Sequence, residues 1–204
     1  MTTKIITPEV LLEAYRHGFF PMAVDPGHIE WFSPEHRGIL LLNEFHIPHG
    51  LRRSLKAQKW RVTIDTVFPE IISACAKREE TWIDEIILAT YCHLFDLGHA
   101  HSLEIWLDGE LTGGLYGVTI GGVFFGESMF YKRTNASKVA LKVLVDLLNA
   151  GGFLLLDTQW TTPHLEQFGI RAVSRSAYIS LLQNALKVSA QFPQKGEIPH
   201  LVPN

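Results

Sequence analysis

The side chains best suited to chemistry lie in two short blocks, residues 126–130 and 157–159. Each block follows an apolar run, so we expect each where a strand ends, a place from which reacting groups project from a rigid frame. The blocks supply the carboxylates of Glu127 and Asp157 and the amide of Gln159. Neither block sets a nucleophile beside a base, and neither forms a metal-ligand set. This inventory indicates a group transfer that works mostly by positioning its reactants.

Each of these side chains also has a structural interpretation. A carboxylate beside a buried strand needs a partner or a raised pKa, so Glu127 could instead form a salt bridge with an arginine. Asp157 could cap a helix or form an Asx turn at the strand end. Because Asp157 and Gln159 are two positions apart, both side chains could point to the same side of a strand.

Other familiar catalytic patterns are absent or incomplete. Ser128 does not fit the GxSxG nucleophile pattern, because Phe130 occupies the position of the last glycine. His99 and His101 form an HxH pair with Glu104 nearby, but no further ligand has telling spacing, so we interpret these histidines as structural. Neither GxGxxG nor GxxxxGK[ST] occurs, so the sequence indicates no nucleotide-phosphate loop.

Two basic stretches could contact phosphate. The first contains Arg52, Arg53, Lys56, Lys59 and Arg61, and the second contains Lys132, Arg133, Lys138 and Lys142. The second stretch opens the strongest predicted helix, and a helix N-terminus with lysines nearby attracts anions. Such runs more often form a solvated face, so phosphate contact is one of two interpretations.

Composition places the chain among globular proteins. It has 204 residues, 47% hydrophobic and 19% charged, which permits a large core and one large domain or a compact pair. The net charge of −3 excludes a protein coated in positive charge, but it leaves room for a local basic patch. Cys75 and Cys92 form no CxxC pair and fall in predicted helices, which indicates buried thiols in a reducing cytoplasm. We expect no leader and no membrane span.

Periodicity and turn residues predict the elements that position the two blocks. Predicted helices cover residues 8–17, 49–58, 68–77, 84–97, 136–149, 163–168 and 175–187. Predicted strands cover residues 39–42, 60–64, 103–107, 111–120, 123–125, 153–156 and 170–173. The expected class is α/β with a mixed sheet. We expect a small N-terminal domain over 1–58, a larger domain over 59–191, and a loose tail over 192–204.

Taken together, these blocks resemble the bacterial leucyl/phenylalanyl-tRNA–protein transferase family. The matching stretches are residues 11–15, 18–21, 31–34, Arg37, 81–83, 98–106, 113–117, 126–130 and 135–138, with Asp157 and Gln159. They run from residue 11 to about 185, nearly the whole chain, in the family's order.

The resemblance implies a fold and an activity. The larger domain is expected to be similar to an acetyltransferase (GNAT) fold that holds the 3′ end of an aminoacyl-tRNA. The implied reaction transfers Leu or Phe, and less so Met, to a protein that begins with Arg or Lys, which marks it for N-end-rule degradation. We expect a cytoplasmic monomer with no cofactor, no metal and no membrane partner.

The residues of the two blocks fit that chemistry. The donor is an activated ester, and an α-amine with a pKa near 8 has an appreciable neutral fraction, so alignment matters more than a strong base. An amide is a very poor proton acceptor, so we assign Gln159 to orienting the amine, and Asp157 to fixing that amide and supplying negative charge. By resemblance, Glu127 holds the cationic acceptor end.

The resemblance also implies binding residues. The slot for the donor side chain is expected to be lined by Leu115, Phe124, Leu141, Leu144, Leu148 and Leu156, most of which also suit a plain core. Stacking of the terminal adenosine is expected at Trp82 or at the aromatics near Tyr15 and Trp31, with Ser128, Asn135 and Ser137 as further substrate contacts. The expected tRNA contacts are Arg52, Arg53, Lys56, Lys132, Arg133 and Lys138.

This chain departs from the family pattern at two places. Met22 stands where some relatives have Trp, and Thr162-Pro163-His164 replaces the usual Asn-x-His. Two alternative functions are an acyl-CoA-dependent N-acyltransferase and a non-catalytic module that binds charged tRNA or basic N-termini. The first would want a glycine-rich pyrophosphate loop, and residues 131–137 contain no glycine.

Overall fold

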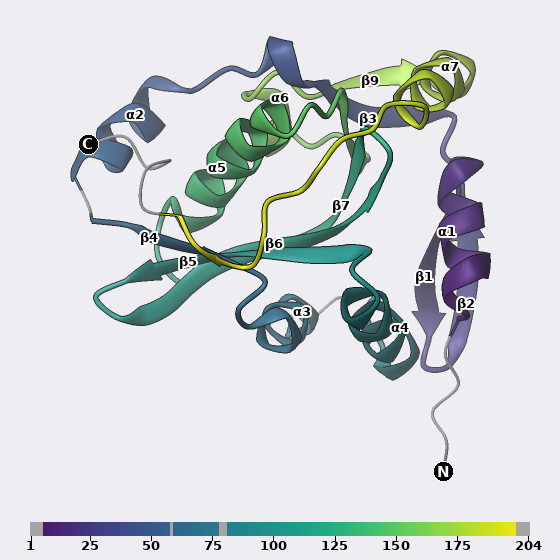
Figure 1. The fold of residues 1–204 in the computed structure, drawn as a ribbon, viewed down its shortest axis with the longest axis horizontal. Helices are drawn as coiled ribbons and strands as arrows, with labels where there is room; N and C mark the ends of the chain where they lie inside the picture. Colours follow the sequence, from purple (N-terminus) through teal and green to yellow (C-terminus); the bar gives the residue numbers. More distant parts are fainter. Residues whose placement is uncertain (1–5, 58, 78–80, 199–204) are drawn as a thin grey trace.

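The computed structural model describes residues 6–57, 59–77 and 81–198, without the side chains of residues 50, 54, 56 and 57 (Figure 1). Its main sheet has eight strands in the order β10-β4-β5-β6-β7-β8-β3-β9. These strands are β3 (His36–Leu41), β4 (Arg61–Ile64), β5 (Ala100–Leu107), β6 (Glu110–Ile120), β7 (Val123–Tyr131), β8 (Leu155–Gln159), β9 (Arg171–Ser174) and β10 (Gly196–Glu197). All neighbours pair antiparallel except β7 and β8, which are parallel.

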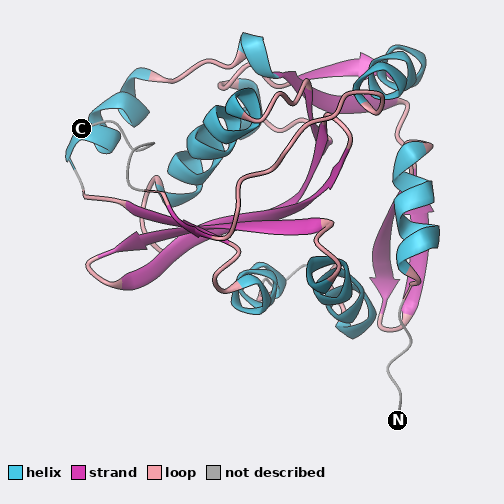
Figure 2. Ribbon diagram, viewed as in Figure 1, coloured by secondary structure: helices cyan, strands magenta, loops and turns pink. Residues whose placement is uncertain are grey.

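Helices cover both faces of this sheet. They are α1 (Pro8–Arg16), α2 (His49–Ala57), α3 (Phe68–Ala76), α4 (Glu85–Asp96), α5 (Ala136–Ala150), α6 (Pro163–Glu166) and α7 (Arg175–Ala185). Figure 2 shows α5 on one face of the sheet and α3 with α4 on the other. Apolar side chains fill both interfaces, because Leu103 packs toward α5 whereas Tyr116 packs toward α3 and α4. The predicted mixed α/β class is confirmed.

The N-terminal segment forms a hairpin that the sequence did not predict. After α1, strands β1 (Phe20–Asp25) and β2 (His28–Phe32) pair as a separate two-stranded sheet beside α4 (Figure 1). Most of these residues are exposed or half-buried, so they lack the alternation of a half-buried strand. Pro21 further weakens the strand pattern, although proline is tolerated on edge strands.

Strand β7 continues past the point where we expected it to end. We predicted a strand over 123–125, but β7 runs to Tyr131, so the expectation that Glu127 follows a strand end is wrong. The ladder with β6 shifts here, because Tyr116 pairs with Ser128 while Gly117 pairs with Gly126. Glu127 is therefore the extra residue of a β-bulge, a feature that re-aims a side chain without ending the strand.

Strand β8 shows the same device. It extends to Gln159, so the expectation that Asp157 ends the strand is also wrong. On its partner β3, Gly38 pairs with Gln159 and Ile39 pairs with Asp157, which leaves Thr158 as the extra residue. Two neighbouring strands thus carry bulges at the two blocks that the sequence singled out.

Strands β7 and β8 pair over a short stretch only. The register runs from Val123–Leu155 to Phe125–Asp157, and no pairing is recorded beyond it. Past this point β7 remains paired with β6, whereas β8 remains paired with β3. The sheet therefore opens between the two bulges.

A strand before residue 58 and a strand of the expected tail both join the main sheet. Strand β3 precedes residue 58, yet it lies between β8 and β9 in the main sheet. The expected domain division at residue 58 stays a prediction. The tail that we expected to be loose holds β10, in which Gly196 pairs with Ile64 of β4. Residues 199–204 lie outside the described part. Within that part, no helix has the length and apolar character that a bilayer crossing requires.

Candidate active site

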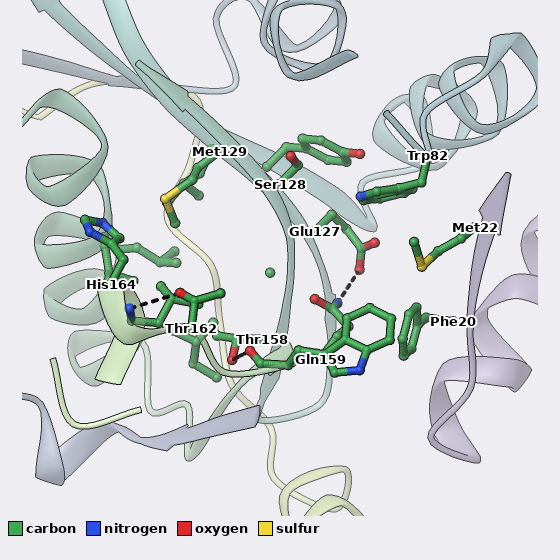
Figure 3. Close-up of a pocket in the computed structure, with 18 residues that line it drawn as sticks. Phe20, Met22, Trp82, Glu127, Ser128, Met129, Thr158, Gln159, Thr162 and His164 are labelled. Carbon is green, nitrogen blue, oxygen red and sulfur yellow. Dashed lines mark hydrogen bonds between the residues drawn. The ribbon is translucent and has the colours of Figure 1, made fainter. Parts of the chain in front are cut away.

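A pocket of about 370 Å³ occupies the opening between β7 and β8 (Figure 3). Its lining comprises Phe20, Met22, Trp82, Leu115, Tyr116, Gly126, Glu127, Ser128, Met129, Leu141, Leu144, Leu156, Thr158, Gln159, Trp160, Thr162, His164 and Leu165. Figure 3 shows Glu127 and Gln159 between Trp82, Met22 and Phe20 on one side and Met129, Thr162 and His164 on the other. The polar groups thus lie at the middle of a mainly apolar pocket.

The carboxyl group of Glu127 sits in a cage of hydroxyl groups. Tyr15 donates a hydrogen bond to Oε1 at 2.7 Å, and Tyr91 donates to Oε2 at 3.0 Å. The two phenolic oxygens are 2.5 Å apart. Burial raises the pKa of Glu127 to about 7, although both tyrosine hydrogen bonds act in the opposite direction. The structure therefore brings α1, α4 and the β7 bulge together around one carboxyl group.

Gln159 turns its amide toward Glu127. Its backbone adopts the left-handed conformation with φ of 56°, which is uncommon for a residue with a side chain. Nε2 donates to Oε1 of Glu127 at 3.3 Å, and the dashed line in Figure 3 marks this contact. Among the described residues, none donates a hydrogen bond to the amide oxygen, Oε1. That oxygen remains open to an N–H donor in the pocket.

Asp157 lies behind the pocket and is fully buried. Arg37 donates to both carboxylate oxygens at 2.8 Å, and Tyr178 donates to Oδ2 at 2.6 Å. The other oxygen also accepts the backbone N–H of Gln159 at 2.9 Å. Asp157 therefore fixes the main chain of Gln159, not its amide as we expected, and Arg37 matches its negative charge.

Arg37 is itself enclosed. Its guanidinium lies 4.5 Å from the ring of Phe20 and 4.7 Å from the ring of Tyr178, and it donates to the Gly18 carbonyl at 3.1 Å. Burial alone lowers the pKa of Arg37, but Asp157 outweighs it and raises the pKa. Burial and the charge of Asp157 raise the pKa of Tyr178. The arginine thus remains charged and ties β3 to β8.

A larger hollow of about 1330 Å³ adjoins the pocket and shares Met129 and His164 with it. Lys77, Lys132 and Lys138 line it, together with the start of α5. The first N–H groups of a helix have no partners within the helix. Asn135 has a left-handed φ of 71° and forms no side-chain cap, so it does not satisfy them. Burial and the nearby charge of Lys138 lower the pKa of His164.

Ser137 adds a hydroxyl group to this hollow. Its side chain is 4% exposed, and its hydroxyl has no hydrogen-bond partner among the described residues. The α5 start can approach the sheet because β6 has Gly113 beneath it. A Cβ atom on Gly113 would lie 2.7 Å from Cβ of Ala136. Three lysines line the hollow with one acidic residue, Glu70, so its lining carries net positive charge. The N–H of Ala136 already donates to the Arg133 carbonyl, so the donors left at this helix start are those of the next residues.

The remaining residues predicted for the site divide by location. Trp82, Leu115, Ser128, Leu141, Leu144 and Leu156 line the pocket, and Asn135, Ser137, Lys132 and Lys138 line the larger hollow. Phe124 and Leu148 do not line the pocket but belong to the core beside α5, and Tyr15 lies behind Glu127. Trp31 lines neither cavity and is 39% exposed on β2. Arg52 and Arg53 are exposed on α2, Arg133 is exposed near Glu110, and the side chain of Lys56 lies outside the described part.

Sequence reasoning assigned no anchoring role to Arg37, Tyr91 and Tyr178. A usable signal existed for Arg37, because a charged residue two positions before the apolar run 39–42 needs an opposite charge when buried. Tyr91 lies on the buried face of α4, where a phenol brings a hydroxyl that needs a partner. Trp160 was also missed, and it lines the pocket with its ring 5.1 Å from that of Phe20.

One member of the histidine pair, His101, has structural partners in the fold. Nδ1 of His101 lies 2.8 Å from Oδ2 of Asp65, and its ring stacks on Phe192 at 4.4 Å. Cys75 is buried in α3 and Cys92 is half-buried in α4. Within the described ranges, no group of three or more His, Cys, Asp or Glu residues could hold a metal ion.

Comparison with known proteins gives consistent matches. The family model described as leucyl/phenylalanyl-tRNA protein transferase matches residues 39–183, and the model of its N-terminal domain matches residues 5–35. Two relatives, both called leucyl/phenylalanyl-tRNA–protein transferase, come from Paramagnetospirillum magneticum (49% identity over 95% of each chain) and Salinibacter ruber (51% identity over 90% of this chain and 82% of that one). Among solved structures, FemX is similar with a TM-score of 0.49 and 11% identity, over 86% of this chain and 65% of that one.

Proposed function

This chain belongs to the leucyl/phenylalanyl-tRNA protein transferase family and is an aminoacyltransferase, and from this premise we propose how its pocket works. The substrates are Leu-tRNA or Phe-tRNA and an acceptor protein. We propose that the acceptor begins with Arg or Lys, that Met is a weaker donor, and that the enzyme acts as a cytoplasmic monomer.

The donor side chain is proposed to enter the apolar part of the pocket. Four leucines line it, and they come from β6, β8 and α5: Leu115, Leu156, Leu141 and Leu144. One methylene in such a slot is worth about 1–3 kcal/mol, so Leu, Phe and Met can share it with graded preference. Met129 adds a flexible side chain that adapts to different shapes.

The acceptor amine is proposed to be oriented by Gln159. Its free amide oxygen accepts one N–H of the neutral amine and directs the nitrogen lone pair at the ester carbonyl. The new C–N bond forms, the C–O bond to the tRNA ribose breaks, and the amine proton ends on the leaving ribose oxygen. Asp157 does not line the pocket, so we assign it to positioning Gln159.

Glu127 is proposed to receive the cationic side chain of the acceptor. The observation that carries the proposal is the direct contact of Glu127 with Gln159 at 3.3 Å inside the apolar pocket. It places an acidic group for Arg or Lys beside the amide that orients the amine of the same residue. Both tasks therefore fall within the reach of one N-terminal residue.

The 3′ end of the tRNA is proposed to run along the larger hollow. Lys132, Lys138 and the start of α5 supply positive charge and N–H donors for phosphate, and Lys77 joins them. Trp82 lines the adjoining pocket, where its indole suits stacking on the terminal adenine. Met22 lines the same pocket, and we propose that Trp82 takes the stacking role in this chain.

The test is turnover with defined substrates. Purified protein, Phe-tRNA and a peptide starting with Arg should yield the Phe-Arg-peptide without ATP, and a peptide starting with Ala should react poorly. Acyl transfer from acetyl-CoA, with none from charged tRNA, would instead establish an acyl-CoA-dependent enzyme. Binding of charged tRNA without product would establish a non-catalytic module.

A further inference from the structure

Three oxygen-bearing groups around Glu127 form a closed set of contacts. Tyr15 comes from α1, Tyr91 from α4 and Glu127 from β7. The distances are 2.7 Å from Tyr15 to Oε1, 3.0 Å from Tyr91 to Oε2, and 2.5 Å between the two phenolic oxygens. All three side chains are at least nine-tenths buried, so bulk water does not separate them.

Counting hydrogens shows what this geometry requires. The two phenols hold one hydrogen each, and the pKa of each phenol is raised by burial, so both remain protonated. If Glu127 is ionised, these two hydrogens must serve three oxygen–oxygen contacts, so one contact always lacks a hydrogen. When both phenols donate to the carboxylate, the 2.5 Å contact between the phenolic oxygens has no hydrogen, and when one phenol donates to the other, a phenol–carboxylate contact has none.

A proton on the carboxyl group resolves this conflict. Oε2 of Glu127 then donates to Tyr91, Tyr91 donates to Tyr15, and Tyr15 donates to Oε1 of Glu127. Each of the three O–H groups donates once, and the two phenolic oxygens and Oε1 each accept one hydrogen. Oε1, the carbonyl oxygen of the acid, also accepts the Gln159 amide. Such a ring satisfies every polar group without burying a net charge.

We propose that Glu127 rests as a neutral acid in a three-proton ring with Tyr15 and Tyr91, and that it releases its proton to solvent when a cationic acceptor side chain enters the pocket. Tyr15 and Tyr91 are then positioning residues. The first half of the proposal concerns the free protein, and the second half rests on the proposed function. The proton balance is simple, because the neutral acid becomes a carboxylate that pairs with the cation, and one proton leaves.

The surroundings of the ring favour a neutral acid that can still ionise. The nearest full charges are Asp157 of β8, which raises the pKa of Glu127, and Arg37 of β3, which lowers it. These two groups pair with each other, so their effects oppose. The other titratable groups nearby are phenols, Tyr116 on β6 beside Tyr91 and Tyr178 on α7 beside Asp157. Burial is the largest influence and brings the pKa to about 7.

The first experiment tests the ring in the free protein. Infrared difference spectra of wild type minus Glu127→Gln, without tRNA or peptide, should show the C=O stretch of a carboxylic acid at pH 6 that disappears as the pH rises through neutrality. The amide of glutamine can replace the acid in the ring, since its NH₂ donates where Oε2–H did. A difference spectrum with only ionised carboxylate at pH 6 would overturn the proposal.

Tyr15→Phe gives an independent readout of the same band. This variant removes a hydrogen bond that stabilises the carboxylate, so the acid band should persist to higher pH than in wild type. A residue that only packs would leave the midpoint unchanged. An unchanged midpoint would therefore remove Tyr15 from the ring, and it would do so whether or not Glu127→Gln folds.

The second experiment tests the coupling to the acceptor. With Phe-tRNA saturating, KM for an Arg-peptide should fall about tenfold from pH 6 to pH 8, relative to Glu127→Gln, as the acid ionises around neutrality. The ratio to the variant cancels the titration of the acceptor amine. For a peptide starting with uncharged citrulline, the ratio of the wild-type KM to the Glu127→Gln KM should not change with pH. Equal pH dependence of this KM ratio for both peptides would overturn the coupling, and the infrared band would still test the ring separately. Absence of any transfer would instead refute the proposed function.

Discussion

At the scale of single residues, the backbone geometry of Gln159 determines where its amide points. Its backbone is left-handed, its backbone N–H donates a hydrogen bond to Asp157, and its side-chain amide donates a hydrogen bond to Glu127. Together these constraints hold the amide oxygen toward the pocket. Three constraints on one side chain indicate a role that depends on orientation, because a displacement of about 1 Å can cost a hundredfold in rate.

Gln159→Ala should therefore lower kcat by about a hundredfold while leaving tRNA affinity near the wild-type value. Thr158→Ala is the matched control, because it changes the neighbouring bulge residue without removing the amide. Single-turnover kinetics with Phe-tRNA, together with a tRNA binding isotherm, separate the two effects. Loss of tRNA binding in parallel with kcat would mean that Gln159 acts on the donor and not on the acceptor amine.

The Arg37–Asp157 pair makes a prediction about stability. Arg37→Gln leaves a carboxylate with no exposed surface and no matching charge, so the free energy of unfolding should fall by about 3–5 kcal/mol. Arg133→Gln is the control, since its partner Glu110 is 3.9 Å away and both side chains are largely exposed. Its effect in denaturant unfolding should stay below about 1 kcal/mol. Similar losses for the two variants would contradict the account of the buried pair.

Glu127 makes a prediction about pH. Its pKa rises from an ordinary 4.5 to about 7 on folding, so the folded state holds a proton that the unfolded state has lost between these values. Stability should therefore fall as pH rises from about 4.5 to 7, by up to roughly 3 kcal/mol, and stay low above it. Glu127→Gln should lack this slope. Chemical denaturation of both proteins from pH 5 to 8 checks it, and parallel curves would refute the raised pKa.

At the scale of elements, the two bulges explain how an otherwise regular sheet carries a site. Regular pairing would alternate side chains strictly between the two faces, whereas one extra residue re-aims the chain. Glu127 is the extra residue of β7, and Thr158 is the extra residue of β8. Both bulges lie just beyond the last parallel pair, Phe125 with Asp157, so the sheet opens where the polar groups turn inward.

The β8 bulge depends on Gly38 of β3. A Cβ atom there would lie 2.4 Å from the backbone of Trp160, so Gly38→Ala must displace the segment that carries Gln159. We expect at least a tenfold loss of kcat/KM, because orientation of Gln159 changes. Gly98→Ala is the control, since it has a positive φ but no neighbour within 4 Å of the added Cβ. Both changes should lower the melting temperature, but only Gly38→Ala should lower kcat/KM.

At the scale of the whole molecule, a net charge of −3 coexists with a positively charged hollow beside the pocket. Attraction of a polynucleotide depends on this local field and not on the total charge. The hollow shares Met129 and His164 with the pocket, so a strand bound along one reaches the other. The fold thus supplies a phosphate path on one side and a mainly apolar slot on the other.

The salt dependence of tRNA binding tests whether the tRNA runs along the larger hollow. Lys132→Ala and Lys138→Ala should each weaken tRNA binding and reduce the slope of log K against log salt by about one. Arg16→Ala is the control, because Arg16 is exposed on α1 beside Glu13 and lines neither cavity. Arg53→Ala tests the stretch on α2 in the same titration. An unchanged slope for both lysine variants would remove the larger hollow from the tRNA path.

The sequence by itself determined the mixed α/β class, most helix positions and the two blocks that carry Glu127, Asp157 and Gln159. These features follow from local signals, namely apolar periodicity, turn residues and polar side chains beside buried runs. The family resemblance of those blocks agrees with the matching models.

Only the tertiary structure decided how these groups are arranged. The ring of Glu127 with Tyr15 and Tyr91 joins residues 112 and 36 positions apart, and the Arg37–Asp157 pair joins residues 120 positions apart. Bulges leave no reliable local pattern, because backbone pairing with another strand creates them. Long-range pairing therefore determined which carboxylate faces the pocket and which is neutralised behind it.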